Sequence, residues 1–123
     1  MSLLLDTNIL IEVLRGNEQA KDLITAQTSP PSISVVSVVE LHAGYKSRRE
    51  ELAGERLLGQ SSVLSLTVDI AKRASVFSRL YQHSHGLDDM DAIIAATAEH
   101  HGLRLATLNV RHFPMFPRLK PAY

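Results

Sequence analysis

The chain has 123 residues, no cysteine, and 13 basic side chains (Lys or Arg) against 13 acidic ones (Asp or Glu). This length fits one compact domain, the lack of cysteine excludes disulfides and thiolate chemistry, and the neutral charge excludes a general nucleic-acid coat. The sequence begins without a basic leader, and no apolar run approaches the roughly 20 residues of a membrane helix. We therefore expect a soluble cytoplasmic protein that forms a single domain over residues 1–123.

Short apolar strands alternate with helical patterns along the chain. The expected strands cover residues 2–6, 32–36, 63–66 and 103–107, and the expected helices cover residues 7–15, 18–26, 67–82 and 88–101, with another opening at Ser37. The charged segment 46–56 predicts a solvated helical hairpin, and the proline-containing tail predicts a loop or a short edge strand. Strands that alternate with helices indicate an α/β fold, with a mainly parallel sheet of about four or five strands covered on both faces.

Acidic residues fall where expected strands meet expected helices. Asp6 ends the first strand. If Ser37 and Asp88 are helix N-caps, Glu40 and Asp91 are both third residues of their helices. Ligands bind beyond the carboxyl ends of parallel strands, so these junctions are where a site is expected.

Carboxylates gathered in one cleft repel each other, and a hard divalent cation such as Mg²⁺ or Mn²⁺ relieves that repulsion. Such an ion binds phosphate and activates water, which favours hydrolysis of phosphodiester bonds. A structural role also explains each acid taken alone. Asp6 can cap the first helix, Glu40 can complete a capping box with Ser37, and Asp91 can do the same with Asp88. The recurrence of acids at successive junctions, and the small residues around Asp91, favour the metal site.

Four segments resemble, in order, the sequence motifs of the PIN-domain family, and they cover residues 4–11, 34–44, 91–98 and 103–113. The short length and the segment Glu40-Leu41-His42-Ala43-Gly44 are similar to VapC-type toxins. The resemblance implies a three-layer α/β/α sandwich with a mainly parallel central sheet, and a Mg²⁺- or Mn²⁺-dependent endoribonuclease. It also implies a toxin homodimer and a VapB-type antitoxin, which alone contacts operator DNA. Asp6, Glu40 and Asp91 match the family's catalytic, metal-binding acids.

One departure concerns the loop after the last core strand. The family often has a fourth acid there, whereas this chain has Asn109 and His112. We expect this loss to weaken a second metal site more than the first. The residues expected to support the three acids are Thr7, Asn8, Asp88, Asn109 and His112. The candidates for RNA contact, with a solvated surface as the alternative, are Lys46, Arg48, Arg49 and Arg111.

Two other functions stay open at this point. A phosphatase of the haloacid-dehalogenase type also begins with a strand that ends in Asp, but it needs a second Asp two residues later, where this chain has Asn8. A non-catalytic PIN-like module that only binds RNA or protein need not keep three mutually repelling acids, so the presence of Asp6, Glu40 and Asp91 speaks against it.

Overall fold

The computed structural model describes residues 2–123. In chain order the elements are β1 (Leu3–Leu5), α1 (Thr7–Leu14), α2 (Glu18–Thr25), β2 (Ser32–Ser34), α3 (Val35–Ala43), α4 (Arg48–Gly59), β3 (Ser62–Leu64), α5 (Val68–His85), α6 (Asp89–His101), β4 (Arg104–Ala106) and the 3-10 helix η1 (Val110–His112). No helix within this range is long and apolar enough to span a membrane.

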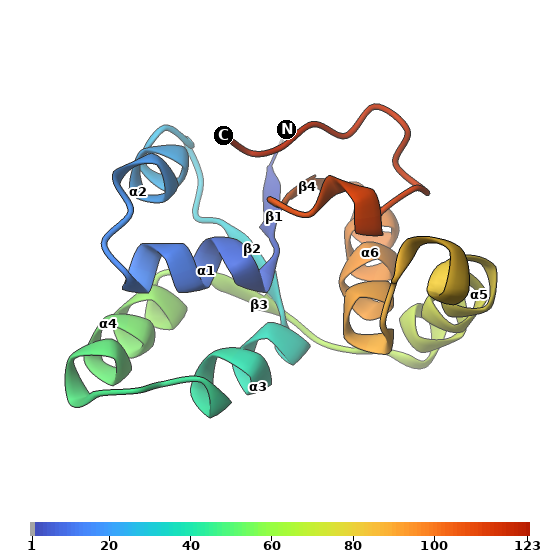
Figure 1. The fold of residues 1–123 in the computed structure, drawn as a ribbon. Helices are drawn as coiled ribbons and strands as arrows, with labels where there is room; N and C mark the ends of the chain where they lie inside the picture. The colour runs from blue at the N-terminus through green and yellow to red at the C-terminus, as the bar shows by residue number, and fades with distance from the viewer. Residues whose placement is uncertain (1) are drawn as a thin grey trace.

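The four strands of residues 2–123 form one sheet in the order β3-β2-β1-β4 (Figure 1). Every neighbouring pair is parallel, with Leu4 opposite both Ser32 of β2 and Leu105 of β4. Parallel strands need crossover connections, and here helices supply them. The prediction of a mainly parallel sheet is therefore confirmed, and all carboxyl ends of the strands point to the same edge.

Helices cover both faces of the sheet, and each face has its own apolar core. Side chains alternate along a strand, so Leu3 and Leu5 face one core and Leu4 faces the other. Figure 1 shows α1, α2 and α4 on one side of the sheet and α5 and α6 on the other. The first core joins β1 and β2 to α1, α3 and α4 through Ile9, Leu10, Ile33, Leu41 and Leu57. The resulting three layers confirm the predicted α/β/α sandwich.

The second core is built on α5 and α6, which pack along each other. An apolar stripe runs along α5, because Ile70, Ala74 and Phe77 are buried and Tyr81 packs partly against them. Alanines on α6 let the two helices approach closely, since a methyl group is the smallest side chain that still packs. Gly102 ends α6 in the left-handed conformation (φ 64°), which glycine adopts without a steric penalty.

Three local predictions are wrong. The strand expected over residues 32–36 stops at Ser34, because the Ser34 hydroxyl accepts the Val36 N–H (3.2 Å) and starts α3. Ser37, predicted as the N-cap, is instead a fully buried residue in the first turn of that helix. The charged segment 46–56 is not a helical hairpin but leads into the single helix α4, whose N-cap is Ser47. The tail after η1 forms a loop, which is one of the two forms predicted for it.

Candidate active site

Asp6 lies at the carboxyl end of the central strand β1 and is 4% exposed. Its Oδ1 accepts the Thr7 N–H (2.8 Å), so Asp6 does cap α1. Its Oδ2 accepts the hydroxyl of Thr107 (2.7 Å), which follows the neighbouring strand β4. Asp6 therefore caps α1 through Oδ1, while Thr107 orients Oδ2, so the helix cap does not prevent Asp6 from binding a ligand as well.

Thr107 is a fully buried residue that holds Asp6 in place and that our sequence reasoning missed. While its hydroxyl donates to Asp6, its oxygen accepts from the Asn8 Nδ2 (3.3 Å) and from the Asn109 N–H (3.0 Å). Asn8, which we expected to support the acids, thus reaches Asp6 through Thr107. The signal was present in the sequence, since Thr107 follows an apolar strand just as Asp6 does.

Glu40 reaches the site from the middle of α3. It is the sixth residue of a helix that begins at Val35, so the prediction that it lies in the first turn is wrong. The Thr7 hydroxyl donates to the Glu40 Oε1 (2.7 Å) and lies 2.9 Å from the Ser37 hydroxyl. Because Thr7 follows Asp6 directly, this hydrogen bond brings the Glu40 carboxylate beside that of Asp6.

Asp91 enters from the first turn of α6. The predicted capping role of Asp88 is confirmed, because its Oδ1 accepts the Asp91 N–H (2.8 Å). The expected strand-to-helix junction is wrong here, since α6 follows α5 and not a strand. The Asp91 Oδ2 lies 3.5 Å from the His112 Nδ1, and the Asp91 side chain is 20% exposed. His112 therefore reaches the acid from η1, beyond the end of β4.

The pKa values show that these carboxylates share one electrostatic environment. Burial, followed by repulsion from Asp88 and Asp6, raises the pKa of Asp91 to about 6, with Glu40 adding to the rise and His112 opposing it. Burial also raises the pKa of Asp6 above its usual value. Hydrogen bonds from Thr107 and Thr7 oppose that rise, while Glu40 and Asp88 add to it. The site is a partly buried acidic cluster whose members resist simultaneous ionisation.

The chemistry of this cluster fits a hard divalent cation, since its members offer carboxylate oxygens, which Mg²⁺ and Mn²⁺ prefer. A cation would also relieve the repulsion that raises the pKa values of Asp6 and Asp91. Within residues 2–123, no group of three His, Asp or Glu side chains is already close enough to share one ion. The acids thus meet in one region without forming a complete set of ligands.

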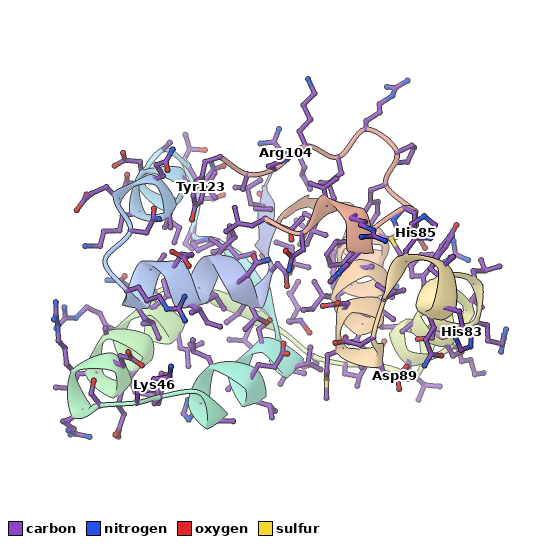
Figure 2. The ribbon with its side chains drawn as sticks, viewed as in Figure 1. Lys46, His83, His85, Asp89, Arg104 and Tyr123 are labelled. Atoms are coloured by element: carbon purple, nitrogen blue, oxygen red, sulfur yellow. The ribbon has the colours of Figure 1, made fainter. Side chains whose placement is uncertain are left out.

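The candidate RNA contacts lie in two places. Arg111 is exposed on η1, next to His112, and so lies on the segment that borders the acids. Lys46 lies at the connection from α3 to α4, on the other side of the view from Asp89 of α6 (Figure 2). Arg48 begins α4 and donates to Glu51 (2.7 Å). Arg49 follows it on the same exposed turn.

The chain matches the family described as PIN domain over residues 3–118. It is 45% identical to Ribonuclease VapC10 of Mycobacterium tuberculosis, over 98% of this chain and 92% of that protein. It is 42% identical to Ribonuclease VapC19 of the same organism, over 98% of each chain. Among solved structures, a toxin–antitoxin complex from Klebsiella pneumoniae superposes with a TM-score of 0.85 at 33% identity, over 99% of this chain and 98% of that one. The chain therefore belongs to the PIN-domain family, and within that family to the VapC-type ribonucleases.

Proposed function

We propose that this protein is a VapC-type endoribonuclease toxin that hydrolyses RNA phosphodiester bonds and that a VapB-type antitoxin neutralises. The observation that carries the proposal is the partly buried cluster of carboxylates at the carboxyl edge of the sheet, together with the raised pKa values of Asp6 and Asp91. Relatives of nearly the same length are named ribonucleases. We further propose that the protein acts in the cytoplasm, where RNA substrates are available, and that residues 1–123 act as a single PIN domain.

We assign Asp6, Glu40 and Asp91 as the catalytic residues and as the ligands of Mg²⁺ or Mn²⁺. The bound ion would supply an activated water and would neutralise charge on the scissile phosphate. Thr107 holds Asp6, and Thr7 holds Glu40, so these hydroxyls fix the orientation of two of the three acids. In the region where the family often has a fourth acid, the Asn109 backbone N–H donates to Thr107 (3.0 Å), and the His112 imidazole lies 3.5 Å from Asp91.

The alternatives are less well supported. A phosphatase of the haloacid-dehalogenase type needs a second Asp at position 8. This chain has Asn8 there, whose amide donates to Thr107 and offers no carboxylate. A non-catalytic binding module does not account for the repulsion among the buried acids, which costs folding free energy unless a function requires it.

The test is cleavage of single-stranded RNA by purified protein with Mg²⁺, with Mn²⁺ and with a chelator. We expect cleavage only with metal, and we expect Asp6→Ala, Glu40→Ala and Asp91→Ala to abolish it while the circular dichroism spectrum stays native. Asp89→Ala is the matched control, because Asp89 lies in the same first turn of α6 as Asp91 but is exposed. Its Oδ1 accepts the Ser78 hydroxyl (3.0 Å). Equal cleavage with metal and with chelator would refute the metal dependence.

We also propose a homodimer that uses α3 and α5. Val39 on α3 is 61% exposed and Val68 at the start of α5 is 70% exposed, and apolar surface of this kind gains free energy when a second copy covers it. The double variant Val39→Glu with Val68→Glu should sediment as a monomer at concentrations where the wild type is a dimer. The same substitution at Leu52, which is 51% exposed on α4, should leave the dimer intact.

We propose that the antitoxin presents an arginine or lysine to the acidic cluster, since a guanidinium binds carboxylates in a two-pronged arrangement. The neutral net charge of the chain suits a toxin that contacts operator DNA only through its partner. Co-expression with the product of the adjacent small gene, followed by sizing and an RNA cleavage assay, tests both points. A monomeric enzyme whose activity no neighbouring product restrains would refute the antitoxin assignment and leave the nuclease assignment standing.

A further inference from the structure

The strand β4 ends the sheet and leaves one edge open. The Arg104 N–H donates to the Ser2 carbonyl (3.1 Å), and the Asp6 N–H donates to the Ala106 carbonyl (2.9 Å), so Arg104 and Ala106 face β1. Backbone groups of successive residues in a strand point to opposite sides, so the N–H and C=O of Leu105 face the open edge. Neither group has a hydrogen-bond partner within residues 2–123.

The C-terminal tail arches over this edge instead of pairing with it (Figure 1). Its turns are closed by bonds from the Phe116 N–H to the Phe113 carbonyl (3.1 Å) and from the Leu119 N–H to the Phe116 carbonyl (3.0 Å). Prolines within the tail have no N–H to offer a neighbouring strand. The tail returns to the end of β4, where the Ala122 N–H donates to the carbonyl of Thr107, the residue after the strand (2.9 Å).

A cavity of about 510 Å³ lies between the tail and the open edge. This volume is within the range of roughly 300–1,000 Å³ that is usual for ligand pockets. Apolar side chains from both cores line it, with Leu105 and Leu119 belonging to the core of α5 and α6, and Leu3 and Leu23 to the opposite core. A strand added beside β4 would place alternate side chains against both of these apolar surfaces.

The charge around the cavity has one sign. Arg104, Arg118 and Lys120 line it and are exposed, and no Asp or Glu is among its lining residues. None of these three cations forms an ion pair with a residue in the range 2–123. In a chain with equal numbers of acidic and basic residues, this local excess favours an occupant that carries negative charge at its ends.

We propose that this cavity binds an extended peptide segment with apolar residues at its centre and acidic residues on its flanks, which adds as a strand alongside β4. Leu105 donates one backbone hydrogen bond to the segment and accepts one from it. The apolar side chains of the segment fill the cavity, and its carboxylates meet Arg118 and Lys120. The proposal does not depend on the proposed ribonuclease activity.

The test uses the full-length ¹⁵N-labelled protein and a short capped peptide with the centre Val-Ile-Val and glutamates on both sides. We expect this peptide to shift the Leu105 amide resonance and to slow its exchange with solvent. A peptide with lysine flanks should bind about tenfold more weakly, since it loses two or three exposed charge pairs with the cations that line the cavity. A peptide methylated on its central backbone nitrogens should lose the effect on Leu105.

Variants test the charge preference separately from the backbone bonds. Arg118→Glu combined with Lys120→Glu should reverse the preference between the two flanks. The matched control is Lys72→Glu with Arg79→Glu, which makes the same charge change at exposed positions of α5 and should leave the preference unchanged. Equal binding of both peptides, or an unaffected Leu105 amide, would overturn the proposal. So would binding of decanoate but of neither peptide, since the cavity would then take an anionic amphiphile.

Discussion

Replacing Asp91 by asparagine removes a charge from the acidic cluster and keeps the shape of the side chain. The pKa of Asp91 is raised from 3.8 to about 6 in the folded chain. A carboxyl group with a raised pKa favours the folded state while it is protonated and loses that contribution as the pH rises through its folded pKa. The metal-free wild type should therefore be less stable above about pH 6 than near pH 4 by the amount that Asp91 contributes.

The size of the effect follows from the shift. About two pKa units correspond to about 3 kcal/mol at 1.36 kcal/mol per unit. Because the side chain is 20% exposed and its neighbours can relax, we expect about 2 kcal/mol. Asparagine carries no charge at any pH, so Asp91→Asn should be more stable than the wild type by this amount near about pH 8. For a domain of 123 residues, that is a rise in Tm of about 8 °C.

The measurement is thermal and urea unfolding of both proteins with a chelator, between about pH 4 and pH 8. Asp89→Asn is the control, because Asp89 lies two residues before Asp91 and its side chain is exposed, so this variant removes the same charge outside the cluster. Added Mn²⁺ should raise the Tm of the wild type and change that of Asp91→Asn much less, since a ligand stabilises only the state that binds it. The variant should also lose RNA cleavage.

Two results would refute this reasoning. A variant that is no more stable than the wild type near about pH 8 would show that the Asp91 charge costs nothing in the fold. A gain of equal size near about pH 4 would show that the effect of asparagine comes from packing or hydrogen bonding, since the carboxyl group is then largely protonated.

Three further substitutions have expected outcomes. Thr107→Val removes the buried donor to Asp6, and it should cost about 1–3 kcal/mol of stability and weaken Mn²⁺ binding in calorimetry even if the fold survives. Gly102→Ala forces a side chain into φ 64° and should cost about 1–2 kcal/mol in urea unfolding, whereas Gly59→Ala, at a helical position with no atom within 4 Å of the added methyl group, should not lower the stability. Phe77→Ala empties a position that is 2% exposed, and it should cost about 3–5 kcal/mol by the same measurement.

The sequence predicted the layers of the fold because the alternation of short apolar strands with helical patterns determines them. The apolar stripe of α5 and the glycine after α6 are local signals whose meaning does not depend on the rest of the chain. The end of β2 was mispredicted because residues 32–36 read equally well as a strand or as the start of a helix. Pairing with β1 and β3 uses only three residues, and Ser34 then serves as the cap.

The candidate site was predicted in part. The position of Asp6 follows from the strand pattern, whereas its proximity to Glu40 and Asp91 was expected mainly from the motif resemblance and agrees with the repulsion among these acids. The hydroxyl of Thr107 was missed because its partner is 101 residues away, and no local pattern reports which strand lies beside β1. The same limit applies to Ser37, whose contact with Thr7 exists only after α1 and α3 have packed.

The position of β1 between β2 and β4 has a consequence for synthesis of the protein. The strand β1 pairs with β4, so the register of Leu4 with Leu105 cannot form until the chain has been synthesised beyond Leu105. Contacts between such distant residues require closing a long loop and form late in folding. A chain emerging from the ribosome would carry Asp6 without Thr107 and without the α6 acids. The acidic cluster therefore requires residues that directly follow both β1 and β4, and the catalytic activity we propose would arise only after Thr107 has been synthesised and has packed against Asp6.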